Sequence, residues 1–204
     1  GRASIDQSFD RPEDSGDNAN IDIVATGVTI DSVYLSFLVT TAEPLFTSPD
    51  GTTVRILIDS DNNPNTGHSY PCIGADHLIE VYGEGNGLAS TSRLYVFDDS
   101  KDSSDWYHLT TLQANAAKGV STSLELQVPN FDLGIEAGSG LKFVIFTSDE
   151  SGNSDSTNII NLSGNEETLT NCVDSESKVF HYPLDDVTCP DCQLTLLNHY
   201  VIVE

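Results

Sequence analysis

Short apolar runs separated by turn-forming residues recur along most of the chain. In residues 33–40, Val33, Leu35, Phe37 and Val39 share one face, which is the period-2 pattern of a half-buried β-strand. Asp31-Ser32 separates this run from residues 21–30, so the two runs predict a hairpin. Comparable runs occupy residues 54–58, 77–82, 93–97, 106–112, 124–128, 141–147, 158–162, 178–182 and 194–203.

This pattern predicts an all-β fold. No long stretch places apolar residues at helical spacing, and residues 114–117 are expected to form a helical turn at most. About eleven short strands punctuated by Gly, Pro, Asn and Asp are typical of an antiparallel sandwich or barrel.

A change of composition divides the chain. Residues 163–177 are polar and contain no strand-like run. We therefore expect a β-sandwich domain over 1–162 and a C-terminal extension over 163–204, packed on the same domain or on a neighbouring subunit. Its apolar end, residues 194–204, is either a final strand of the sandwich or a strand that pairs with a neighbouring subunit.

Charge narrows the choice of partners. The 204 residues include 8 Lys and Arg against 32 Asp and Glu, which gives a net charge of −24. Nucleic-acid binding is excluded because it needs clustered basic residues. No apolar run approaches the roughly 18 residues of a membrane span. Cations are the natural partners, and the alternative is a solvated surface that keeps the protein soluble.

The cysteines point to an oxidising compartment. Cys72, Cys172, Cys189 and Cys192 are an even number and predict disulfides, with three pairings open. The alternative is a zinc site at the Cys189-Pro190-Asp191-Cys192 turn. Because the chain starts with Gly1 rather than Met, we expect an extracellular or cell-surface protein that is secreted after signal-peptide removal.

Residues 54–67 predict a metal site. An apolar strand runs into Asp59, Asp61 and Asn63, whose side-chain oxygens alternate along a turn. Calcium takes 6–8 oxygen ligands, and we expect Asn65 and Asp76 to help complete the shell.

Two other interpretations of this loop stay open. Glu80, rather than Asp76, could reach the ion from the next strand. The loop could also be an Asx-rich turn without an ion, in which the side chains accept hydrogen bonds from nearby backbone N–H groups. An EF-hand is excluded, because Pro64 stands where that loop needs glycine.

Several of these segments together resemble the DOMON-like β-sandwich group, which includes the family 9 carbohydrate-binding modules. The matching pieces are an Asp-rich lead before residues 21–30, the loop LIDSDNNPNTG, and Ile73-Gly74-Ala75-Asp76 running into His77-Leu78-Ile79-Glu80. The resemblance covers about residues 6–160. It implies a two-sheet, jelly-roll-like sandwich and says nothing about residues 163–204, which we expect to form a disulfide-bearing C-terminal extension.

The resemblance also implies a candidate sugar site. Sugar-binding members of the group stack a sugar ring on aromatic side chains, for which Trp106 and Tyr107 are the candidates. Asn161-Leu162-Ser163 is a candidate N-glycosylation sequon. The sequence contains no Gly-x-Ser-x-Gly, His-Glu-x-x-His or phosphate-cradling motif, so we expect no enzymatic activity.

These observations predict a calcium-stabilised structural subunit of an extracellular assembly, such as a filament, surface layer or matrix. Its partners would be further copies of the chain, joined by strand addition, or cell-surface components. The alternative is a carbohydrate-binding module that recognises a polysaccharide.

Overall fold

The computed structural model describes residues 2–6, 18–47, 51–98, 100, 106–112, 114–116, 121–135, 140–162, 194–197 and 200–203. Regular structure in these ranges is almost all β-strand, and the one helical element is the 3-10 turn η1, Asn130–Leu133. No helix in this part of the chain is long and apolar enough to cross a membrane.

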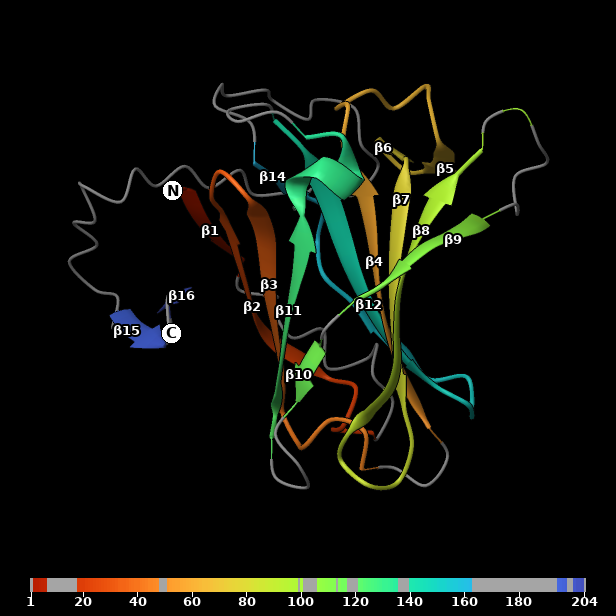
Figure 1. Ribbon diagram of the computed structural model, residues 1–204. Helices are drawn as coiled ribbons and strands as arrows, with labels where there is room; N and C mark the ends of the chain where they lie inside the picture. The colour runs from red at the N-terminus through yellow and green to blue at the C-terminus, as the bar shows by residue number, and fades with distance from the viewer. Residues whose placement is uncertain are drawn as a thin grey trace.

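Five strands form the first sheet, sheet A, in the order β1-β2-β3-β11-β10 (Figure 1). All neighbouring pairs are antiparallel. The predicted turn joins β2 to β3, and the Asp31 carboxylate accepts hydrogen bonds from the backbone N–H groups of Val33 and Tyr34, both at 2.7 Å. The strands are β1 Arg2–Asp6, β2 Ile23–Ile30, β3 Tyr34–Thr41, β10 Ala114–Ala116 and β11 Ser123–Pro129.

The second sheet, sheet B, has the order β13-β12-β4-β7-β8-β9, and β14 also pairs with β12. Its neighbouring strands are antiparallel as well. The strands are β4 Thr52–Asp59, β7 His77–Gly83, β8 Ala89–Phe97, β9 Trp106–Thr111, β12 Lys142–Asp149, β13 Ser154–Ser156 and β14 Ile160–Asn161.

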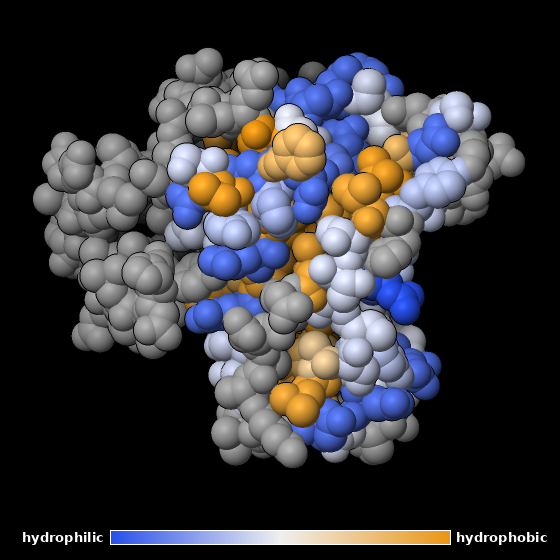
Figure 2. Space-filling model, viewed as in Figure 1, coloured by the Kyte–Doolittle hydropathy of each residue, from blue (hydrophilic) through white to orange (hydrophobic). Residues whose placement is uncertain are grey.

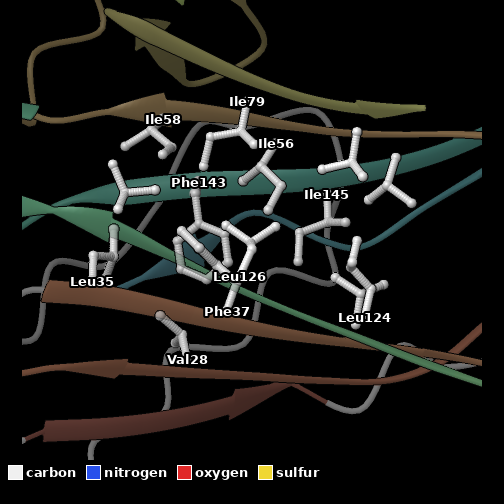
Figure 3. Packing of buried hydrophobic residues seen from close by; sticks show 14 of the residues in the cluster. Val28, Leu35, Phe37, Ile56, Ile58, Ile79, Leu124, Leu126, Phe143 and Ile145 are labelled. Carbon is white, nitrogen blue, oxygen red and sulfur yellow. The ribbon is translucent and has the colours of Figure 1, made fainter. Parts of the chain in front are cut away.

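The hydrophobic core lies between the two sheets. Alternation turns Val54, Ile56 and Ile58 of β4 inward, where all three are fully buried. Phe37 of β3 meets Phe143 of β12 edge to face, with ring centroids 5.1 Å apart. Figure 3 shows side chains of both sheets interleaving around this pair. Figure 2 shows hydrophobic residues along the seam between the sheets.

A short hairpin covers part of the outer face of sheet B. It consists of β5, His68–Tyr70, and β6, Ile73–Ala75. The ring of Tyr70 lies 5.4 Å from that of Phe146, which points away from the core. Ile73 and Val144 are buried although neither belongs to the core between the sheets. The hairpin therefore builds a second apolar layer on sheet B.

The expected all-β fold with antiparallel sheets is confirmed. The helical turn expected over 114–117 is wrong, because Ala114–Ala116 pairs with Leu124–Leu126 of β11 as strand β10. The apolar terminus is not a final strand of the sandwich. Its two strands, β15 Leu194–Leu197 and β16 Tyr200–Val203, pair with each other in a separate sheet. The predicted strand 178–182 and the domain boundary at 163 lie outside the described residues.

Substitution of Phe37 tests the packing of the two sheets. We expect Phe37→Ala to lower the free energy of unfolding by about 3–5 kcal/mol, because it leaves a cavity against Phe143. Phe131→Ala is the matched control, since this ring is 92 % exposed and its loss should change stability by less than about 0.5 kcal/mol. Urea unfolding measures both, and equal effects would contradict the assigned core.

Candidate metal centre

The Asp-rich loop begins where β4 ends. Ile58 faces the core, so the next residue, Asp59, faces the outer side of sheet B, where hairpin β5–β6 covers it. Its side chain is 0 % exposed. Residues 60–67 form the loop, and Asp76 connects β6 to β7. The end of one strand and the start of its neighbour therefore carry the acidic residues.

The structure brings Asp59, Asp61 and Asp76 together. One carboxylate oxygen of each lies within 4.8 Å of the others. Asp59 is buried, Asp76 is half-buried and Asp61 is exposed, so solvent reaches the cluster from the Asp61 side. Three converging carboxylates can hold a metal ion, and oxygen ligands favour a hard cation such as calcium. Glu80 is not part of this group, because its carboxylate accepts a hydrogen bond from Nε of Arg55 at 3.0 Å.

Backbone N–H groups orient the carboxylates. Asn63 donates to Oδ1 of Asp59 at 3.0 Å and to Oδ1 of Asp61 at 2.9 Å. Ser60 donates from its N–H and its hydroxyl to Oδ2 of Asp76, at 2.9 and 3.0 Å. The loop is thus an Asx-rich turn, as one interpretation of the sequence predicted. A carboxylate has about four lone-pair positions, so these bonds leave capacity for an ion.

The two asparagines expected as ligands interact with each other. Oδ1 of Asn63 accepts hydrogen bonds from the backbone N–H of Asn65 at 3.2 Å and from its side-chain amide at 3.3 Å. Neither residue is held against the carboxylate cluster by a hydrogen bond from its own side chain in the described structure. Their part in metal binding stays a prediction.

Burial raises the pKa of Asp59 from 3.8 to about 6. This pKa is a net result: the nearby carboxylate of Asp76 also raises it, while the N–H groups of Asn63 and Gly74 and the charge of Lys142 lower it. Lys142 stands directly opposite Asp59 in the pairing of β12 with β4. These groups do not fully offset the cost of burying the charge, and a bound cation would reduce that cost.

Asn62 is a loop residue that sequence reasoning missed. Its side-chain oxygen is buried and has no hydrogen-bond partner, which is a costly state for a polar atom. Its backbone is left-handed, with a φ of 57°. An unsatisfied oxygen next to Asp61 in the chain, in the loop that contributes to the carboxylate cluster, fits a cation site. Only the alternate spacing of Asp59, Asp61 and Asn63 was visible in the sequence, and Asn62 falls between the last two.

Close backbone packing explains the Ile73-Gly74-Ala75-Asp76 motif. A Cβ on Gly74 would lie 1.8 Å from the carbonyl oxygen of Thr66 and 2.6 Å from that of Asn63. The loop therefore crosses directly over β6, and only glycine leaves room for it. The N–H of Gly74 also points to Oδ2 of Asp59 at 3.4 Å. The motif sets the position of the loop relative to the buried carboxylate.

The candidate sugar-stacking residues do not share a surface. Trp106 lies opposite Phe97 in the pairing of β9 with β8, and Tyr107 is the next residue along β9. Successive side chains of a strand point to opposite faces. The Trp106 ring packs against Phe97 at 5.1 Å and His68 at 5.6 Å between centroids. The two residues thus form no joint platform for a sugar ring.

Two further candidates were expected outside the loop. Asn161 is 1 % exposed in β14, so its side chain does not stand on the surface turn that the sequon suggested. Attachment of a glycan there stays a prediction that this burial disfavours. Cys72, in the turn between β5 and β6, is disulfide-bonded. Cys172, Cys189 and Cys192 lie outside the described residues, so the pairing stays a prediction.

No protein-family model, no curated protein and no solved structure matches this chain. The resemblance to the DOMON-like group therefore stays a prediction from the sequence motifs, and function has to be argued from the site and the strand arrangement.

Replacing Asp59 separates the cost of its burial from its role in binding. In chelator at pH 7 we expect Asp59→Asn to melt no lower than the wild type, because it removes a buried charge. The wild type should lose stability relative to Asp59→Asn as the pH rises from about 4 to 6, because the folded pKa of Asp59, about 6, lies above the ordinary 3.8. Above about pH 6 the difference in stability should stay constant. Millimolar calcium should raise the melting temperature of the wild type by several degrees and leave the variant unchanged.

Glu43→Gln is the matched control for this experiment. Glu43 is exposed and outside the cluster, so the variant loses the same charge but should keep the calcium response. Identical melting curves of the wild type with calcium and with chelator would rule out the metal site.

Gly74→Ala tests the crossing of the loop over β6. We expect a loss of about 3 kcal/mol in unfolding free energy, together with the loss of calcium stabilisation, because the loop must move away from β6. Gly134→Ala isolates the cost of a strained backbone, as its φ is 63° but its Cβ would meet nothing within 4 Å. That control should lose only about 1 kcal/mol and keep the calcium response.

Proposed function

We propose that this chain is a non-enzymatic, secreted, calcium-stabilised β-sandwich that serves as a structural subunit of an extracellular or cell-surface assembly. The assembly is a filament, surface layer or matrix of identical copies joined by strand addition. The observation that carries the proposal is the position of the terminal strands. β1 is the edge strand of sheet A, and β16 lies close to β1 and β2 (Figure 1).

Terminal strands at a sheet edge are suited to joining subunits. An added strand binds mainly through backbone hydrogen bonds, which do not depend on the identity of its side chains. β15 and β16 form their own two-stranded sheet instead of entering sheet A or sheet B. Since an isolated hairpin is marginally stable in water, this pair gains stability from contact with a larger sheet.

Calcium has two roles in this proposal. The ion offsets the repulsion between Asp59, Asp61 and Asp76 and holds the loop against β6. It also lowers the charge of a subunit that carries −24, which makes contact between copies less unfavourable. Assembly should therefore depend on the ion itself as well as on ionic strength.

The disulfide of Cys72 gives the hairpin β5–β6 a place in this proposal. Cys72 has a backbone φ of 64°, which residues other than glycine rarely adopt. We propose that it bonds to a cysteine of the extension over 163–204 and ties that extension to the hairpin that covers Asp59. Such a bond persists in an oxidising compartment, which agrees with secretion.

Polysaccharide recognition is the weaker alternative. It depends on the resemblance to carbohydrate-binding modules. Trp106 and Tyr107 point to opposite faces of β9, so the expected stacking platform does not form. No observation on the described residues favours it over assembly.

Assembly should require calcium. We expect negative-stain electron microscopy and sedimentation velocity to show filaments or sheets in millimolar calcium and single chains of 22.0 kDa in chelator. Sodium chloride at matched ionic strength should not replace calcium, because screening alone does not fill the site. Asp59→Asn should stay as single chains in millimolar calcium, and Glu43→Gln should assemble like the wild type.

Single particles under every condition would contradict the proposal. Retention of such particles on an insoluble polysaccharide, with release by free sugar, would instead support the carbohydrate-binding alternative.

A further inference from the structure

The connection between β1 and β2 is unusually long for antiparallel neighbours. β2 and β3 are joined by residues 31–33, and β5 and β6 by residues 71–72. Between β1 and β2 lie the sixteen residues 7–22. Antiparallel neighbours normally need only about 2–5 residues. A connection of this length does not require the two strands to come from the same copy.

β2 is a strand that needs a permanent partner on its outer edge. Its sequence, IVATGVTI, contains no charged residue to discourage pairing. Thr26, Gly27 and Val28 are buried, and they stand in register opposite residues 4–6 of β1. Without β1, an uncharged strand edge would be open to any other chain.

The chain is long enough for β1 to reach a second copy. The eleven residues 7–17 span at most about 36–40 Å when extended. A domain of about 160 residues has a radius of gyration of roughly 15 Å, so this reach is comparable to the diameter of the sandwich.

We propose that β1 is exchanged between copies, so that residues 2–6 of one chain pair with β2 of the next in the register found within one chain. This inference rests on the proposed assembly and names its joint. The donating strand and the accepting edge are different surfaces, so the contact is head-to-tail. Such a contact repeats along an open chain unless its rotation closes a ring.

Single-cysteine variants can detect the exchange, because Ala3 stands directly opposite Thr29. Ala3→Cys and Thr29→Cys are prepared separately, mixed in calcium and oxidised. We expect a disulfide-linked pair of twice 22.0 kDa on a non-reducing gel, and peptide mass spectrometry should locate the bond between residues 3 and 29. Arg2→Cys with Ile30→Cys is a second in-register pair in case the first destabilises the edge.

Out-of-register variants supply the control. Thr26 pairs with Asp6, so Ala3→Cys mixed with Thr26→Cys should give no such product. The double variant Ala3→Cys/Thr29→Cys should form covalent ladders when assembled.

Electron microscopy of the same samples separates the two proposals. Assemblies in which the double variant closes only within single chains, and the mixed variants stay unlinked, would overturn the exchange and leave assembly standing. Linked pairs without larger assemblies would support the exchange and overturn the proposed structural role. If neither linked pairs nor assemblies form, both proposals are overturned.

Discussion

The buried carboxylate of Asp59 constrains the outer side of sheet B. It is placed there by the alternation of β4, whose preceding residue belongs to the core. Lys142 and two backbone N–H groups favour its ionised form, yet its pKa still lies near 6. The loop 60–67, the hairpin β5–β6 and Gly74, which the loop crosses, are all arranged around the Asp59 carboxylate. A cation at this point would relieve the unfavourable charge and fix the same elements in place.

Much of the sandwich could be predicted from the sequence because its strands are half-buried. Alternation marks β3 and β4 directly, and the core confirms which face of each is inward. The grouping of Asp59 and Asp61 follows from their spacing on one turn. Asp76 and Glu80 were both open as ligands from the next strand, and the antiparallel pairing of β7 with β4 brings Asp76, not Glu80, to the end of β4.

The elements that could not be predicted are those whose structure is decided by distant contacts. β5 is polar and only three residues long, so it has no apolar period; it forms because β6 pairs with it. β10 lies in an alanine-rich segment that local propensity assigns to helix, and its pairing with β11 overrides that preference. The burial of the Asn62 oxygen is a property of the folded loop alone. Residues 194–203 read as one apolar strand because Asn198-His199 is a weak turn signal.

The acidity of the chain favours one kind of contact between copies. Paired strands lie about 4.8 Å apart, which is less than the Debye length of about 8 Å at physiological salt. Charges at such a contact would act on each other almost unscreened, so an interface built on side-chain charges would be repulsive at −24 per chain. β2 avoids this because it has no charged residue and offers backbone groups as its edge. In the proposed assembly, strand pairing at β2 would let highly charged subunits join without having to match opposite charges, while a cation would neutralise the acidic cluster elsewhere on the domain.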